Sequence, residues 1–104
     1  MIIQLNTDKN LMIHSEYEAQ ITEKLNNDLE RYTDYITRIE VHMSDENGSK
    51  GGINDKKCLL EARLEGKQPI VTSDLGDTYD IALKGATEKL RNALNTTVSK
   101  MKAH

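Results

Sequence analysis

The side chains of this sequence that could do chemistry are few, and Cys58 and His42 come first. Cys58 alternates with Leu60 and Ala62, as side chains on one strand face do, so it is predicted to be a small core hydrophobe rather than a nucleophile. His42 shares a strand face with Glu40, but two ligands do not make a metal site, and the other two histidines have no metal-like spacing. We therefore expect an exposed polar histidine, and no metal or cofactor.

Glycine-rich loops that cradle phosphate are also missing. Gly48, Gly51 and Gly52 stand between two expected strands rather than before a helix, so hairpin geometry explains them. The sequence has no Gly-x-Gly-x-x-Gly, no Walker loop and no nucleophile elbow. Because nothing assembles a nucleophile, a base and an orienting group, the sequence predicts neither an enzyme nor a small-molecule substrate.

Basic side chains of the last expected helix are more informative. At about 100° per residue they lie on the two flanks of its apolar stripe, from which they can reach phosphate oxygens. One flank holds Lys84, Arg91 and Lys102, the other Lys89 and Lys100, and Lys24 and Arg31 share one side of the first helix. Solvated helix faces are the other interpretation, which the residues alone favour, since no aromatic side chains alternate with the cations.

The overall charge limits which partners are possible. The formal net charge is −3 and the pI about 5.6, which argues against an indiscriminate nucleic-acid binder. Residues 15–33 carry five acids against two bases, whereas residues 77–102 carry five bases against three acids. One cysteine, no membrane-length apolar run and no signal-peptide pattern at the start lead us to expect a cytoplasmic protein without membrane contact.

Periodicity in the first half predicts a strand, a helix and a second strand. Residues 2–6 form the first strand, and residues 36–45 alternate as the second. Between them a capping box of Ser15 and Glu18 begins a helix that is expected to reach about Thr33. Its apolar stripe consists of Tyr17, Ile21, Leu25, Leu29 and Tyr32.

The second half predicts two more strands and a long helix. Residues 46–54 form a hairpin loop, residues 55–65 the return strand, and residues 68–73 an edge strand, because Pro69 cannot donate to a ladder. The last helix runs over about residues 77–102, with Asp74 and Asp77 serving its beginning. The expected fold is α+β, with the order β-α-β-β-β-α, both helices on one sheet face, and one domain over residues 1–104. Its open face would be lined by Arg38, Glu40, His42, Glu61 and Arg63.

Several runs of residues resemble a known family. Residues 39–48 and 54–63 look like the ribosome hibernation promoting factor and ribosome-associated translation inhibitor family, in its short single-domain form. Residues 68–70, residues 77–79 and Lys89-Leu90 extend the similarity over nearly the whole chain. The resemblance implies a fold like that of double-stranded RNA-binding domains. It also implies binding to the small ribosomal subunit in the channel used by mRNA and tRNA.

In that family, basic residues of both helices contact rRNA phosphates, and the matching positions here are Lys24 or Arg31 with Lys89 and Arg91. The chain departs from the family at Asn92, where well-known members are basic, and in the uncharged residues 95–99. Fewer phosphate contacts predict weaker, more salt-sensitive binding. We expect no pairing of whole ribosomes, since the sequence shows no C-terminal extension of the kind that long members use.

Two hypotheses of different classes follow. The first is a translation inhibitor, a monomer or weak homodimer, that binds small-subunit rRNA without turnover and blocks mRNA and tRNA. The second is a protein-binding regulatory module of the same fold that has lost rRNA binding, as the acidic first helix suggests. The predicted rRNA-binding residues are Lys24, Arg31, Lys84, Lys89, Arg91, Lys100 and Lys102.

Overall fold

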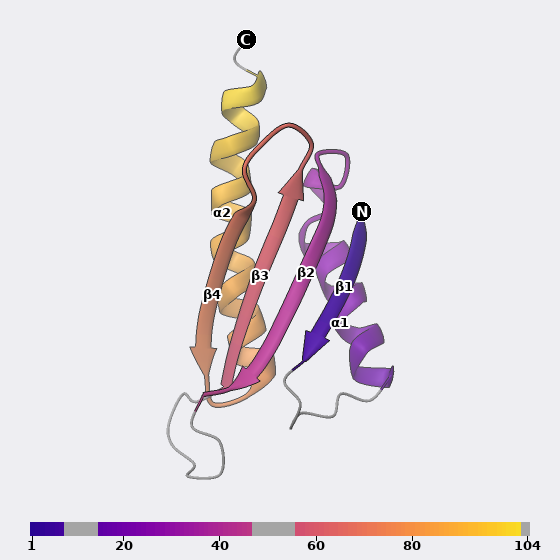
Figure 1. The fold of residues 1–104 in the computed structure, drawn as a ribbon, viewed down its shortest axis with the longest axis vertical. Coiled ribbons are helices and arrows are strands. Elements are labelled where there is room, and N and C mark those ends of the chain that lie inside the picture. The colour runs from indigo at the N-terminus through magenta and orange to yellow at the C-terminus, as the bar shows by residue number, and fades with distance from the viewer. Residues whose placement is uncertain (8–14, 47–55, 103–104) are drawn as a thin grey trace.

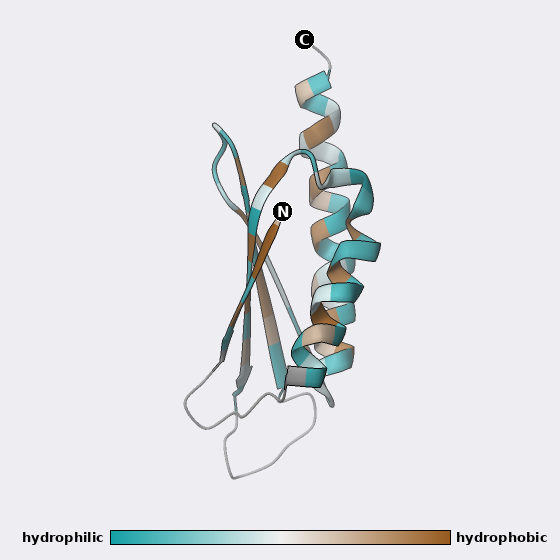
Figure 2. Cartoon of the chain, turned by 90° about the vertical axis from the view of Figure 1, so that its right-hand side faces the viewer, coloured by the Kyte–Doolittle hydropathy of each residue, from teal (hydrophilic) through white to brown (hydrophobic). Residues whose placement is uncertain are grey.

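The computed structural model describes residues 1–7, 15–46 and 56–102, and its elements follow the predicted order. They are β1 (Ile2–Thr7), α1 (Ser15–Asp28), the 3-10 helix η1 (Glu30–Tyr32), β2 (Ile36–Asp45), β3 (Lys56–Leu64), β4 (Ile70–Gly76) and α2 (Tyr79–Lys102). Figure 1 shows both α-helices behind the sheet. Figure 2 shows the sheet edge-on, with both helices on the same side of it. The predicted β-α-β-β-β-α fold with one covered sheet face is confirmed. Neither described α-helix has the length and apolar character needed to cross a membrane.

The sheet has four strands in the order β1-β2-β3-β4, so β1 and β4 are its edges. β2, β3 and β4 pair antiparallel, whereas β1 pairs parallel to β2, with Ile3 opposite Ile39 and Leu5 opposite Val41. A parallel pair needs a crossover connection, and α1 lies within the one between β1 and β2. Pro69 directly precedes the edge strand β4, as expected.

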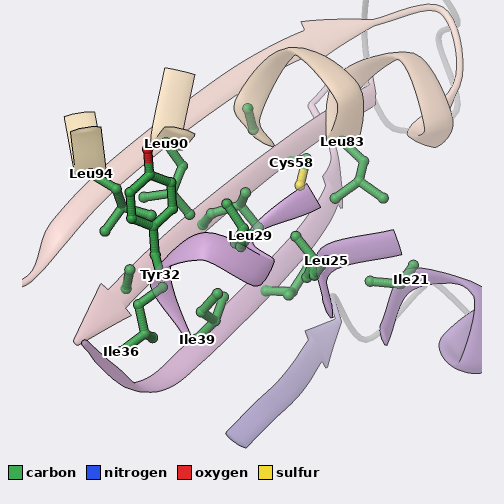
Figure 3. Close-up of a cluster of buried hydrophobic side chains, with 14 of the residues drawn as sticks. Ile21, Leu25, Leu29, Tyr32, Ile36, Ile39, Cys58, Leu83, Leu90 and Leu94 are labelled. Carbon is green, nitrogen blue, oxygen red and sulfur yellow. The ribbon is translucent and has the colours of Figure 1, made fainter. Parts of the chain in front are cut away.

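Alternation along the strands separates a buried face from an open one. Ile39, Val41 and Met43 of β2 are buried, and their partners on β3 are Ala62, Leu60 and Cys58. The helices cover this face with the buried residues Ile21 and Leu25 of α1, Leu29 directly after it, and Leu83, Leu90 and Leu94 of α2. Figure 3 shows how these side chains point toward one another between the helices and the sheet. The core is therefore aliphatic, with Tyr32 as its one aromatic member among the buried residues that the structure describes.

The ends of α1 and β4 differ from the sequence prediction. α1 ends at Asp28, and η1 then tightens the chain through bonds from the Tyr32 N–H to the Leu29 carbonyl (2.9 Å) and from the Thr33 N–H to the Glu30 carbonyl (3.4 Å). This tighter turn keeps both Leu29 and Tyr32 in the core. β4 runs to Gly76 because β3 continues opposite it as far as Lys56.

The start of α2 corrects another expectation. The Thr78 hydroxyl accepts a hydrogen bond from the Ile81 N–H at 3.1 Å, so Thr78 caps the helix. Asp74 lies within β4 instead and does not serve the helix start. The predicted capping box depends on the Ser15 side chain, and most of the predicted hairpin loop lies within residues 47–55. Both lie outside what the structure describes.

Cys58 is fully buried, as its alternation predicted, and burial raises the pKa of its thiol to about 12. The thiol of an unfolded chain has a pKa of about 8.5. At a pH between this pKa and that of the folded chain, the unfolded chain loses the thiol proton that the folded chain keeps. At mildly alkaline pH we expect a thiol reagent to react with the native chain about a thousandfold more slowly than with the chain unfolded in guanidinium. A native rate equal to the unfolded rate would show that Cys58 is accessible.

Candidate nucleic-acid interface

Two hollows lie along α2, the first facing α1 and the second facing η1, and each is lined by one basic side chain from either side. The first, of about 320 Å³, is lined by Tyr17, Gln20, Ile21 and Lys24 of α1 and by Asp80, Leu83 and Lys84 of α2. Ile21 and Leu83 are buried, so they form its apolar floor. Lys24 and Lys84, predicted from separate helices, are therefore brought to one site.

The second hollow lies where α1 passes into η1. It has a volume of about 410 Å³ and a predominantly polar lining, made by Arg31, Tyr32, Glu88, Arg91, Asn92 and Asn95. The Arg31 guanidinium stands 5.8 Å from the centre of the Tyr32 ring, a cation–π distance, and the core in turn holds that ring. Arg31 and Arg91 are thus brought together as well.

The two hollows repeat along the helices. Lys84 and Arg91 are seven residues apart on α2, which is a rise of about 10 Å. Lys24 and Arg31 are also seven residues apart, with Lys24 on α1 and Arg31 on η1 beyond its end. Because both pairs occur in the same order, α1 and α2 run in the same direction (Figure 1). We call this line of four basic residues, Lys24, Arg31, Lys84 and Arg91, the inter-helix groove.

A direct bond between the helices closes the first end of the groove. The Tyr17 hydroxyl donates a hydrogen bond to the Asp80 carboxylate at 2.8 Å. Burial and this bond to a carboxylate both raise the pKa of Tyr17 above its ordinary value, so the hydroxyl keeps its proton throughout the physiological range. The contact fixes the spacing of the two helices beside Lys24 and Lys84.

Acidic groups reduce the positive charge of the groove unevenly. Lys24 forms an ion pair with Asp28 one turn further along α1, at 3.0 Å. Among the described residues, Arg31, Lys84 and Arg91 form no ion pair, although Glu88 lines the second hollow. The arginine end is therefore the part of the groove best suited to bind an anion from outside.

The remaining predicted basic residues divide between the two flanks of α2. Lys102 stands 5.9 Å from the centre of the Tyr35 ring, on the flank of Lys84 and Arg91. Lys89 faces β4 instead, where its ammonium group donates to the Ser73 carbonyl at 2.9 Å and lies 3.5 Å from Asp74. Lys100 is exposed on that same flank of the helix. The two flanks thus serve different surfaces and do not form one patch.

Sequence reasoning missed the amide side chains that line the groove. Asn92 and Asn95 lie one and four positions after Arg91, so with Glu88 they follow the helical spacing of one face. That spacing could have identified them. Gln20 lines the first hollow in the same way. Amides can donate to phosphate oxygens without adding charge, which suits a groove on a chain of net charge −3.

The open sheet face carries a polar network instead of a metal site. Arg63 contacts Glu40 at 3.0 Å and Glu61 at 3.1 Å, and its hydrogen bond holds the pKa of Glu61 below the ordinary value. Asn6 adds a long contact of 3.5 Å to Glu40. Within residues 1–7, 15–46 and 56–102, no group of three or more His, Cys, Asp and Glu residues could hold a metal.

Known proteins resemble the chain in both sequence and fold. A family model described as Sigma 54 modulation protein / S30EA ribosomal protein matches residues 6–102. The N-terminal domain of Thermus thermophilus Protein Y matches with a TM-score of 0.73 at 18% identity, covering 93% of this chain and 99% of that one. A ribosomal subunit interface protein from Coxiella burnetii matches with a TM-score of 0.67 at 25% identity, covering 100% of both chains. No curated protein sequence matches.

These matches confirm the family that residues 39–48 and 54–63 resemble, and its fold like that of double-stranded RNA-binding domains. Members of this family regulate translation as ribosome-associated factors and are not enzymes, so the non-enzymatic prediction is confirmed as well. The family model spans nearly the whole chain. The chain therefore belongs to the Sigma 54 modulation protein / S30EA ribosomal protein family.

Proposed function

We propose that this protein binds the small ribosomal subunit in the cytoplasm and blocks the access of mRNA and tRNA without any chemical turnover. The inter-helix groove carries the proposal, because each of its two hollows receives basic side chains from two helical segments: Lys24 of α1 and Lys84 of α2 in the first, and Arg31 of η1 and Arg91 of α2 in the second. Two facing cations can hold a phosphate group between them, whereas a solvated helix face needs no such pairing. Family membership supplies the ribosome as the source of the phosphates.

The number of groove cations sets how strongly salt should affect binding. Each phosphate contact contributes about 0.7–0.9 to the slope of log affinity against log salt concentration. Four contacts therefore give a slope of about −3, and a fourfold rise in salt weakens binding by about a hundredfold. Further cations on the same flank, such as Lys102, would steepen this dependence.

Co-sedimentation with purified small subunits at a series of salt concentrations tests the proposal. We expect the protein to sediment with the ribosomal fraction at low salt and to be released at high salt. Its inhibition of in vitro translation should decrease over the same salt range as its binding. If the protein stayed out of the ribosomal fraction even at low salt, ribosome binding through this groove would be disproved.

The second hypothesis, a protein-binding module, is supported by the outer face of α1. Glu16 and Glu23 are seven residues apart, so they lie on one side of α1, where both are exposed and form no ion pair among the described residues. Such a face would repel rRNA and suit a basic protein surface. Ribosome association that survives charge reversal in the groove would favour this hypothesis over phosphate binding.

A further inference from the structure

β4 is an edge strand that exposes apolar side chains. Val71 and Leu75 lie on the open sheet face, opposite Glu61 and Lys57 of β3, and retain 53% and 47% of their accessible surface. Ser73 lies between them on the same face. Exposed edge strands with apolar side chains are ready templates for pairing with another strand. The chain therefore needs a structural feature that prevents uncontrolled strand pairing along β4.

The main-chain groups along the free side of β4 bond to side chains. The Leu75 N–H donates to the Asp74 carboxylate at 2.9 Å, and the Ser73 carbonyl accepts from the Lys89 ammonium group at 2.9 Å. Asp74 and Lys89 also contact each other at 3.5 Å. In a strand, the N–H and carbonyl of one residue point to the same side, and residues two apart share that side. Ser73 and Leu75 therefore direct these groups away from β3, and the Asp74–Lys89 pair occupies them.

The same edge is complementary to itself. Ser73 is the central residue of β4, so antiparallel pairing of two copies about Ser73 places Val71 of each copy opposite Leu75 of the other. The main-chain groups of Val71, Ser73 and Leu75 then face the matching groups of the second copy in hydrogen-bonded positions. The exposed apolar side chains would cover one another on the open face, where cross-strand pairs stabilise a sheet.

We propose that the free edge of β4 is a docking edge for β4 of a second copy of this chain, and that the Asp74–Lys89 pair keeps it closed. Removing the Lys89 ammonium group releases the Ser73 carbonyl, and turning the Asp74 carboxylate away releases the Leu75 N–H. The two sheets then join into one continuous sheet. In this arrangement Lys89 blocks the strand edge by bonding to the Ser73 carbonyl, which is why it faces β4 rather than the groove. This interface does not depend on ribosome binding.

Sedimentation velocity of Lys89→Ala from micromolar to millimolar concentration tests the proposal. We expect its self-association constant to increase by about tenfold over the wild type, the effect of losing one hydrogen bond to a charged group. Lys100→Ala is the matched control, since Lys100 is exposed on the same flank, and we expect wild-type behaviour from it. Adding Leu75→Lys to Lys89→Ala should restore the monomer through like-charge repulsion.

Disulfide trapping tests the register separately and does not require Lys89 to change. A cysteine in place of Ser73 would face its copy across the two-fold axis at a Cα separation of about 5.5 Å, within the range that a disulfide spans. We expect Ser73→Cys to form covalent dimers under mild oxidation, and Gln4→Cys, on the open face of the opposite edge strand, to stay monomeric. Equal trapping of both variants would overturn the proposal. So would a Lys89→Ala variant that associates no more strongly than Lys100→Ala.

Discussion

Replacing Arg31 and Arg91 together with glutamate should release the protein from small ribosomal subunits. The two guanidinium groups line one hollow, one from η1 and one from α2, so the double variant removes two phosphate contacts and places two carboxylates where a phosphate would lie. We expect affinity to decrease by more than about a hundredfold at low salt, and the remaining salt slope to become shallower by about two units. Quantitative co-sedimentation over a salt series measures both.

The matched control changes the net charge equally at positions away from the groove. Arg38 lies on the open sheet face and Lys67 lies exposed in the turn after β3. Replacing both with glutamate should change affinity only through the overall charge, by less than about tenfold. Equal losses in the two double variants would mean that net charge, rather than the groove, governs binding.

Leu25→Ala should cost about 3 kcal/mol of the free energy of unfolding, within the range of about 2–5 kcal/mol for leucine truncation in a packed core. Leu25 is fully buried and lies between Ile21 and Leu29 on the stripe by which α1 packs on the sheet (Figure 3). Removing its branched end leaves a cavity at the centre of that contact. Urea unfolding followed by circular dichroism gives the change, with the slope in denaturant as a check on two-state behaviour.

Asn26→Ala is the control for this prediction, because Asn26 is the next residue of the same helix and is exposed. Its effect should stay within about 0.5 kcal/mol. A loss below about 1 kcal/mol in Leu25→Ala would mean that α1 can shift to fill the space, so the helix would be less firmly fixed than its burial indicates.

The element order and the core could be predicted because apolar residues recur with a regular period in the strands and in the helices. In β2 and β3, apolar residues alternate with polar ones, and only one pairing register buries Ile39, Val41 and Met43 together. In α1 and α2, the apolar stripe had to face the sheet. The parallel pairing of β1 is different, because it depends on the crossover through α1 and leaves no local signal.

The candidate site could be predicted only in part, because it depends on how the helices sit on the sheet. Helical spacing placed Lys89 and Arg91 on opposite flanks of α2, but it could not show which flank faces α1. That choice is set where α2 crosses β4. A Cβ at Gly85 would fall on the Asp74 carboxylate, so the helix backbone lies close to the strand there and turns Lys89 toward it. The glycine alone gave no sign of this.

The shared direction of α1 and α2 has a consequence for where an anion would bind. Both helices begin near the Tyr17–Asp80 bond, so the partial positive charges of two helix dipoles meet at that end. The Asp80 carboxylate already occupies this favourable position, and Glu16 and Glu18 stand in the first turn of α1. A phosphate approaching the same place would meet a negative group. The peptide dipoles are thus balanced within the molecule, which leaves recognition of external phosphate to the guanidinium side chains about three turns further along.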